Sequence, residues 1–178
     1  MRVCQSFRWA PFASNLSAVV DGEWWRRGTL PNAAVLGAGL WDLLWGGSGD
    51  GGDVSPQRYA AEVVNALRAA RRRAPAASLA WLDLPAMVTH KQLSERKRAR
   101  MTEVRARALN AAARRAVEAD ADLAAHVAWL GLHGASEGCG EACTMEGIHY
   151  SNQTYEVVAQ QLVNALGDGP EEAQCAML

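Results

Sequence analysis

The sequence has no long apolar run and no excess of charge of either sign. No uninterrupted apolar stretch approaches the roughly 18–20 residues that a membrane-spanning helix needs, and charged residues stand where a signal peptide would be apolar. Eighteen Lys and Arg residues against nineteen Asp and Glu give a net charge of −1. This balance argues against a dedicated nucleic-acid-binding domain, which normally carries a basic excess. The 178 residues, 49% of them hydrophobic, fit one globular domain.

Cysteine is scarce, since four residues are too few for a disulfide scaffold. Cys139 and Cys143 flank a short Gly-containing loop, and their spacing allows either a local disulfide in an oxidising compartment or two free thiols. A zinc site would need two further ligands, for which His133 and His149 are the nearest candidates. Because this spacing fits no common zinc pattern, we expect no metal ion and no other cofactor.

Three short apolar runs predict buried β-strands, within residues 33–39, 78–85 and 126–130. Continuous apolar character, rather than strict alternation, is typical of strands that are covered on both faces of a parallel sheet. Apolar residues at helical spacing predict helices over residues 55–73, 93–120 and 151–166. For the long middle helix the predicted apolar face consists of Leu93, Met101, Val104, Ala108 and Ala112. The alternation of strands and helices predicts an α/β domain, in which ligands bind at the carboxyl ends of the strands.

Glu146 and His149 form the most informative pair in the sequence, in a turn before the last predicted helix. Two intervening residues let the carboxylate fold back onto a ring nitrogen of the histidine. In a hydrolytic or acyl-transfer triad, such a carboxylate orients the histidine while the histidine takes a proton from a serine. An ordinary polar loop whose acidic residue favours the following helix N-terminus is the alternative interpretation of the same spacing.

Five sequence blocks, taken together, resemble one enzyme family. They are Phe7-Arg8-Trp9-Ala10-Pro11-Phe12, Gly37-Ala38-Gly39-Leu40-Trp41, Trp81-Leu82-Asp83-Leu84-Pro85, Met101-Thr102 with Asn110-Ala111-Ala112, and Glu146-Gly147-Ile148-His149 with Val163-Asn164. Their order and spacing resemble the luminal domain of the sialate and capsule polysaccharide O-acetyltransferases. That family belongs to the SGNH (GDSL-like) hydrolase superfamily and is related to the PC-esterase group. The resemblance implies a domain over residues 1–166, followed by a flexible tail over residues 167–178.

The resemblance implies a three-layer α/β/α fold with a mainly parallel sheet and the transfer or removal of acetyl groups on a glycan hydroxyl. The family's D-x-x-H motif maps onto Glu146 and His149, with His149 as general base and Glu146 as its orienting carboxylate. Many superfamily members also place an asparagine as oxyanion donor near the strand that ends at residue 37. Here Gly37 and Gly39 stand in that region, so backbone N–H groups would serve, with Trp41 lining the substrate cleft.

Two departures separate this sequence from the superfamily. Its G-D-S serine block is absent: Ser6, Ser14, Ser17 and Ser48 lie in other contexts. The carboxylate of Glu146 is also one methylene longer than the family's aspartate. We expect that the first strand, with its serine, is missing from this chain, and that the chain alone is inactive. The alternative is a non-catalytic SGNH-like protein that binds a glycan or another partner.

The remaining expectations concern partners and compartment. A glycan or acetylated carbohydrate is the expected partner, without nucleic acid, and the basic residues of the predicted middle helix are interpreted as a solvated surface. Trp24, Trp25, Trp41 and Trp45 are expected near the predicted cleft, where core packing is the first interpretation and a sugar-stacking surface is the alternative. The resemblance implies the Golgi lumen, with membrane attachment only through segments outside this chain.

Overall fold

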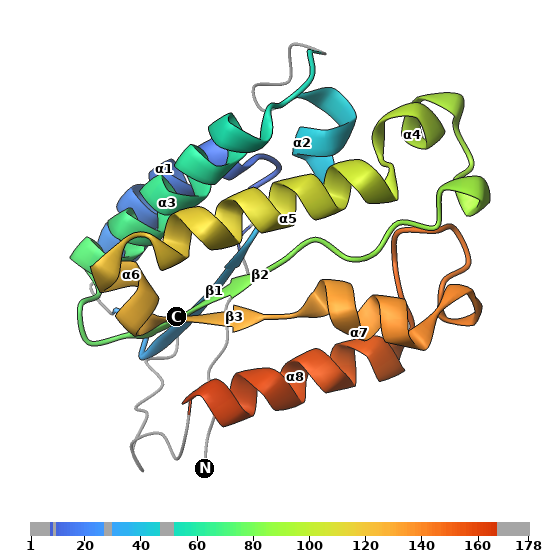
Figure 1. The fold of residues 1–178 in the computed structure, drawn as a ribbon. Helices are drawn as coiled ribbons and strands as arrows, with labels where there is room; N and C mark the ends of the chain where they lie inside the picture. The colour runs from blue at the N-terminus through green and yellow to red at the C-terminus, as the bar shows by residue number, and fades with distance from the viewer. Residues whose placement is uncertain (1–7, 9, 27–29, 47–51, 167–178) are drawn as a thin grey trace.

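The structure is a computed structural model that describes residues 8, 10–26, 30–46 and 52–166, and it contains a three-stranded parallel sheet (Figure 1). The strands are β1 (Ala33–Gly37), β2 (Ser78–Leu82) and β3 (Val127–Leu130), in the spatial order β1-β2-β3. Their register places Leu36 beside Trp81 and Trp81 beside Trp129. All three strands were predicted from continuous apolar runs, and the structure confirms them.

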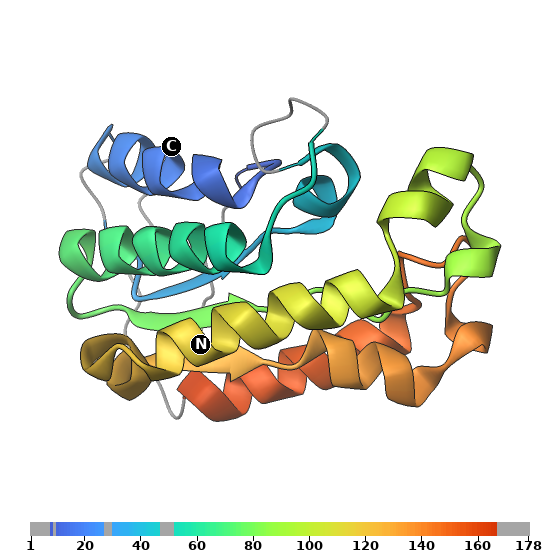
Figure 2. The same cartoon turned by 45° about the horizontal axis from the view of Figure 1, so that its top comes forward.

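Helices lie on both faces of this sheet and make three layers (Figures 1 and 2). One face is covered by α1 (Ala13–Arg26), α3 (Pro56–Arg73) and α5 (Glu103–Glu118), whose apolar side chains pack with Leu36, Leu79 and Trp81. The opposite face is covered by α8 (Asn152–Leu166), where Val158 packs with Ala80 and Leu130. The predicted α/β fold with layers of helices around a parallel sheet is therefore confirmed.

Short helices connect these elements. They are α2 (Leu40–Trp45), α4 (Glu95–Arg100), α6 (Ala121–His126) and α7 (Leu132–Cys139), with 3-10 turns η1 (Thr89–Lys91) and η2 (Glu141–Cys143). The predicted helices over residues 55–73 and 151–166 are confirmed as α3 and α8. The described part of the first resemblance block, residues 8 and 10–12, precedes α1 and forms no strand. The proposed tail, residues 167–178, lies outside the described residues.

The single helix predicted over residues 93–120 is wrong, because the chain forms α4 and α5 instead. Ser94 Oγ accepts a hydrogen bond from Lys97 N (3.2 Å) and Thr102 Oγ1 accepts one from Arg105 N (3.4 Å), so each residue caps a new helix. The interruption between the two helices changes the buried face: Leu93 is 84% exposed and Val104 79% exposed. Of the predicted face, Met101 and Ala112 are buried, and the buried side of α5 consists of Ala106, Leu109, Asn110, Ala112, Ala113 and Val117.

The chain leaves β2 as an extended segment, residues 83–88, that is buried although it belongs to no sheet or helix. Buried backbone groups need hydrogen-bond partners, and here side chains supply them. Asn110 of α5 binds both the N–H and the C=O of Leu84 at 2.9 Å each. Ser136 Oγ of α7 accepts from Ala86 N (2.8 Å), and Glu103 Oε2 accepts from Met87 N (2.7 Å). This buried segment contacts the loop that carries Glu146 and His149.

Candidate functional site

Glu146 and His149 lie in a tight loop that is closed by an antiparallel bridge between Thr144 and Tyr150. Gly147, at the tip, has a φ of +83°, and its N–H donates to Thr144 Oγ1 (2.9 Å). The loop rests on the extended segment, because Val88 N donates to Gly147 O (3.0 Å) and the Tyr150 hydroxyl donates to Ala86 O (3.0 Å). Two independent anchors thus fix the turn that presents the pair.

Within this loop the structure brings the two predicted residues into contact. Glu146 Oε1 binds His149 Nδ1 and also accepts from the backbone N–H of His149 at 2.9 Å. The other carboxylate oxygen, Oε2, lies 3.7 Å from Lys97 Nζ of α4. Glu146 is the sheltered partner, with 26% of its side chain exposed, whereas 71% of the His149 side chain is exposed.

The environment keeps Glu146 ionised. Partial burial by itself opposes ionisation, but the hydrogen bond from the His149 amide and the charges of His149 and Lys97 outweigh it and lower the pKa of the carboxyl group. When the ring is neutral, an ionised Glu146 accepts the Nδ1 proton of His149, and this tautomer has its free lone pair on Nε2. That nitrogen belongs to an exposed ring, so it is open to a proton donor from solvent or substrate.

No hydroxyl or thiol group of the described residues makes a hydrogen bond with the His149 ring, whose bonded partner is Glu146. The pair therefore has the contact that the predicted base and orienting carboxylate require, without a nucleophile from the described part of the chain. Of the four serines considered from sequence, Ser14 lies within α1, as does Ser17. Ser6 and Ser48 lie outside the described residues.

The other predicted site residues lie at the carboxyl end of β1. Gly37 ends the strand, and Gly39, with a φ of +125°, precedes α2. A Cβ at Gly39 would lie 2.8 Å from the Tyr59 hydroxyl and 2.9 Å from Leu84 Cδ2, so close packing requires glycine there. Gly39 thus contacts the start of the extended segment, whereas the Glu146–His149 loop contacts its far end at Val88. Trp41 is 40% exposed on α2. Their role as an oxyanion donor and cleft stays a prediction.

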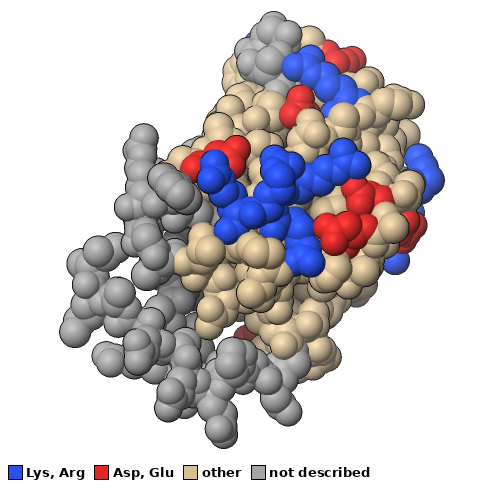
Figure 3. All heavy atoms as spheres, turned by 90° about the vertical axis from the view of Figure 1, so that its left-hand side faces the viewer, with Lys and Arg blue, Asp and Glu red and all other residues tan. Residues whose placement is uncertain are grey.

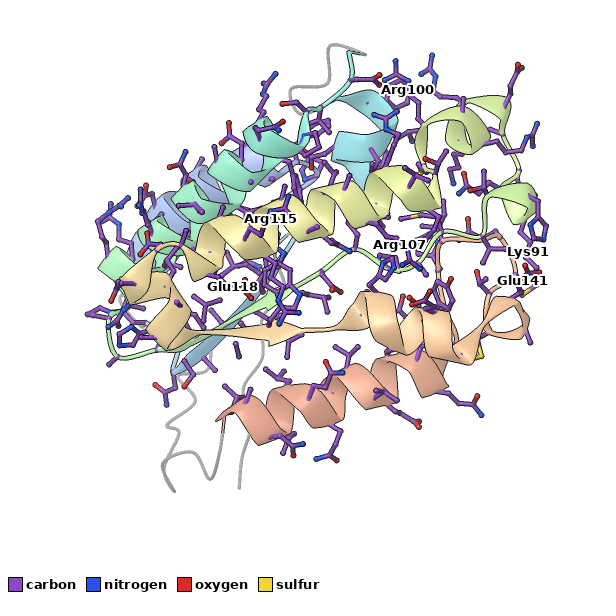
Figure 4. The ribbon with its side chains drawn as sticks, in the orientation of Figure 1. Lys91, Arg100, Arg107, Arg115, Glu118 and Glu141 are labelled. Atoms are coloured by element: carbon purple, nitrogen blue, oxygen red, sulfur yellow. A yellow bond between two sulfur atoms is a disulfide. The ribbon has the colours of Figure 1, made fainter. Side chains whose placement is uncertain are left out.

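A polar cluster between α5 and α7 was not predicted from sequence. His133 Nε2 lies 3.1 Å from Glu103 Oε1, and Arg107 binds both Glu103 and Glu137 (Figure 4). Burial opposes ionisation of Glu103, but the hydrogen bonds from Met87 N and Arg107 outweigh it and lower the pKa. This cluster joins the two helices to the extended segment. Sequence spacing gives no sign of it, because Glu103 and Arg107 lie far along the chain from His133 and Glu137.

Asp83, which follows β2 at the edge where ligands were expected, is committed to internal contacts. Its carboxylate accepts from His133 N (2.8 Å) and from Trp129 Nε1 (3.2 Å), and only 8% of the residue is exposed. Burial raises the pKa of this carboxyl group, although the two hydrogen bonds act against the rise. Asp83 therefore orders the ends of β2 and β3 and does not face a ligand.

The sequence matches no protein-family model and no curated protein. One similar solved structure is the crystal structure of LAE5, an alpha/beta hydrolase enzyme from the metagenome of Lake Arreo, Spain, at a TM-score of 0.59 and 15% identity. The match covers 86% of this chain and 67% of that chain. The chain has a hydrolase-like α/β fold. Finer membership in the SGNH superfamily remains a proposal.

Many α/β hydrolases carry their nucleophile in the pattern Gly-x-Ser-x-Gly, at a sharp turn between a strand and a helix. Gly134-Ala135-Ser136-Glu137-Gly138 has this pattern, but Ser136 lies inside α7 and is fully buried. Its Oγ is within 2.7 Å of Leu132 O and 2.9 Å of His133 O, and it accepts from Ala86 N. Ser136 therefore holds the extended segment in place and is not an exposed nucleophile.

Two surface hollows of the described residues lie away from Glu146 and His149. A hollow of about 390 Å³ lies between α7 and α8, and one of about 460 Å³ lies at the amino ends of β2 and β3; neither includes a predicted site residue. Within the described ranges, no cluster of His, Cys, Asp and Glu has the arrangement of a metal site, and no helix has the length and apolarity to cross a bilayer.

Proposed function

We propose that this domain is an acyl-ester hydrolase or acyltransferase of the SGNH type, acting on O-acetyl groups of a glycan. The observation that carries the proposal is the Glu146–His149 contact, in which the carboxylate binds Nδ1 and leaves Nε2 exposed. In this scheme Nε2 takes the proton from the attacking hydroxyl, and Glu146 stabilises the imidazolium that forms. The hydroxyl belongs to the family's serine, which the described residues do not supply.

The charge around the pair supports this role. Lys97 Nζ lies 3.7 Å from Glu146 Oε2 and favours the ionised carboxylate. In this scheme the carboxylate stays charged during the proton transfer, and afterwards the neutral ring again carries its proton on Nδ1. The Cys139–Cys143 disulfide favours an oxidising compartment, which agrees with the Golgi lumen that the resemblance implies. The sugar and the acetyl donor are left open by this proposal.

Because this chain alone is expected to be inactive, the test is hydrolysis of a chromogenic acetyl ester and of an O-acetylated glycan by a form of the protein that carries the family's serine, and by its variants. We expect His149→Ala to lower kcat/KM by roughly 10²–10⁴-fold, because general-base catalysis contributes about that much. His126→Ala is the matched control, since His126 is also an exposed histidine beside a carboxylate, 3.1 Å from Asp122, and it lies on α6. Equal activity of wild type and His149→Ala would contradict the proposal.

A non-catalytic glycan-binding protein is the second candidate, and the absence of a hydroxyl partner for His149 among the described residues favours it. This alternative expects retention of the chain on a glycan column together with no acetate release above the uncatalysed rate. Measured turnover that His149→Ala abolishes would exclude it.

A further inference from the structure

A disulfide closes the chain just before the acid–base loop. Cys139 ends α7 and Cys143 ends η2, and their Cα atoms lie 5.8 Å apart. Between them, Gly140 has open space where a Cβ would stand, and Glu141 and Ala142 are exposed. The bridge therefore belongs to a solvent-facing loop, which is the setting in which external thiols reach a disulfide.

This cysteine loop, residues 139–143, is linked directly to residues 144–146, the arm that carries Glu146. Cys143 O accepts from Ser151 N at 2.8 Å, and the next residue, Thr144, accepts from Gly147 N through its hydroxyl. Lys91 Nζ binds the carbonyl of Glu141 and, at 3.0 Å, the carbonyl of Thr144 (Figure 4). The position of Glu146, two residues after Thr144, consequently depends on where the cysteine loop holds Thr144.

The arm that carries His149, residues 148–151, shares the Ser151 contact with the cysteine loop but has a further support of its own. Tyr150, its neighbour, donates to Ala86 O in the buried interior, and Gly147 O accepts from Val88 N. Both partners belong to the extended segment after β2, which is fixed by α5 and α7 through Asn110 and Ser136. The Tyr150 contact does not pass through the disulfide, so His149 keeps one anchor in the interior when the bridge opens.

We propose that reversible reduction of the Cys139–Cys143 disulfide regulates the pair by releasing the Glu146 arm while His149 stays anchored. One thiolate of an external dithiol attacks one Sγ, the S–S bond breaks, and a mixed disulfide forms. The second thiol of the reductant then displaces the cysteine, so the dithiol is oxidised to its disulfide and the protein gains two electrons and two protons as two thiols. The regulatory meaning of this step rests on the proposed function.

Site-resolved hydrogen exchange of the full chain tests the proposal without requiring turnover. The background variant carries Cys4→Ser and Cys175→Ser, so that only the Cys139–Cys143 pair responds to dithiothreitol. Reduction is expected to speed exchange of the amides of residues 141–146 and of the His149 N–H, which donates to Glu146, by roughly tenfold or more. The amides of Leu84 and Ala86, which donate to Asn110 and Ser136, are expected to keep their exchange rates. The double variant Cys139→Ser/Cys143→Ser is expected to have the exchange rates of the reduced chain, and dithiothreitol is expected to leave those rates unchanged.

Unchanged exchange at the His149 amide on reduction would overturn the proposal. Exchange that accelerates equally at Leu84, Ala86 and His149 would also overturn it, because the disulfide would then stabilise the whole domain and not one arm. The outcome is separable from the function test: a local response of exchange supports the redox coupling even where His149→Ala shows that hydrolysis does not need this histidine.

Discussion

Gly147 shows at the scale of one residue why the acid–base turn tolerates little change. Its φ of +83° lies in the region that favours glycine, and a Cβ there would stand 2.2 Å from Val88 O. The Gly147→Ala variant must move either the turn or the extended segment, so we expect it to lose at least about 2 kcal/mol of the free energy of unfolding. Urea denaturation followed by circular dichroism measures this loss.

Gly138→Ala is the control for that prediction, because Gly138 lies in α7 with nothing within 4 Å of the added Cβ. Helix propensity predicts a gain of up to about 1 kcal/mol for this variant. Similar effects of the two substitutions would contradict the assignment of a packing constraint to Gly147.

Some contacts of the candidate site could be predicted from the sequence, and others could not. The contact between Glu146 and His149 was predicted, because three residues of separation in a turn suffice to place the two side chains together. The Lys97 contact, and the packing of Gly39 against Tyr59, join parts of the chain that are distant in sequence. No local pattern encodes such contacts, so they could only be found in the folded structure.

At the scale of elements, the extended segment of residues 83–88 depends on Asn110. Replacement by alanine would leave the N–H and C=O of Leu84 without partners in a buried place, at about 1–3 kcal/mol for each group. We therefore expect Asn110→Ala to lower the free energy of unfolding by about 2–5 kcal/mol, measured by urea denaturation. Asn65→Ala on the exposed side of α3 is the control, where helix propensity predicts a small gain. A loss below about 1 kcal/mol for Asn110→Ala would refute this account.

The same scale shows where the sequence prediction of secondary structure failed. Apolar spacing alone predicted one helix over residues 93–120, yet Ser94 is the N-cap of α4 and Thr102 is the N-cap of α5. Residues of this type at the start of a helical stretch are a recognised signal. Ser94 and Thr102 therefore indicated two helix starts, whereas the apolar periodicity indicated one continuous helix.

At the scale of the whole molecule, Asp42 makes the stability depend on pH. Its carboxylate is buried in α2 and accepts from Ala13 N (3.1 Å), the first residue of α1, and burial raises its pKa to about 6 although that hydrogen bond opposes the rise. The ordinary value is 3.8, so between about pH 4 and 6 the folded state binds a proton that the unfolded state has lost. Stability contributed by this group therefore falls as the pH rises through that window and stays low above it.

Asp42→Asn keeps an oxygen for Ala13 N and removes the buried charge. We expect this variant to be more stable than wild type by about 1–3 kcal/mol at pH 7.5 and nearly equal to it below pH 4, in urea denaturation at the two pH values. Asp21→Asn, which removes an exposed partner of Arg73, is expected to change stability by less than about 1 kcal/mol at either pH. An Asp42→Asn protein that is less stable at pH 7.5 would refute the sign of this effect.

Several exposed charges of the described residues lie in pairs. Where α3 approaches α6, arginines lie beside acidic side chains on the surface (Figure 3), with Arg68 bound to Asp120 and Arg71 3.5 Å from Asp122. On α5, Arg114 pairs with Glu118. This interleaving agrees with the interpretation of the basic residues as a solvated surface, in which exposed pairs contribute little to stability.

The strand order has a last consequence for where a ligand is held. In open parallel sheets the binding crevice forms where the strand order reverses, because the helices on either side of that point leave to opposite faces. The described strands follow one another as β1-β2-β3 without a reversal, so this part of the sheet creates no crevice of that kind. Under the proposed function, the substrate at this carboxyl edge is therefore held by loops. Among them, the loop that carries Glu146 and His149 is bounded at one end by a covalent bridge and at the other by α8.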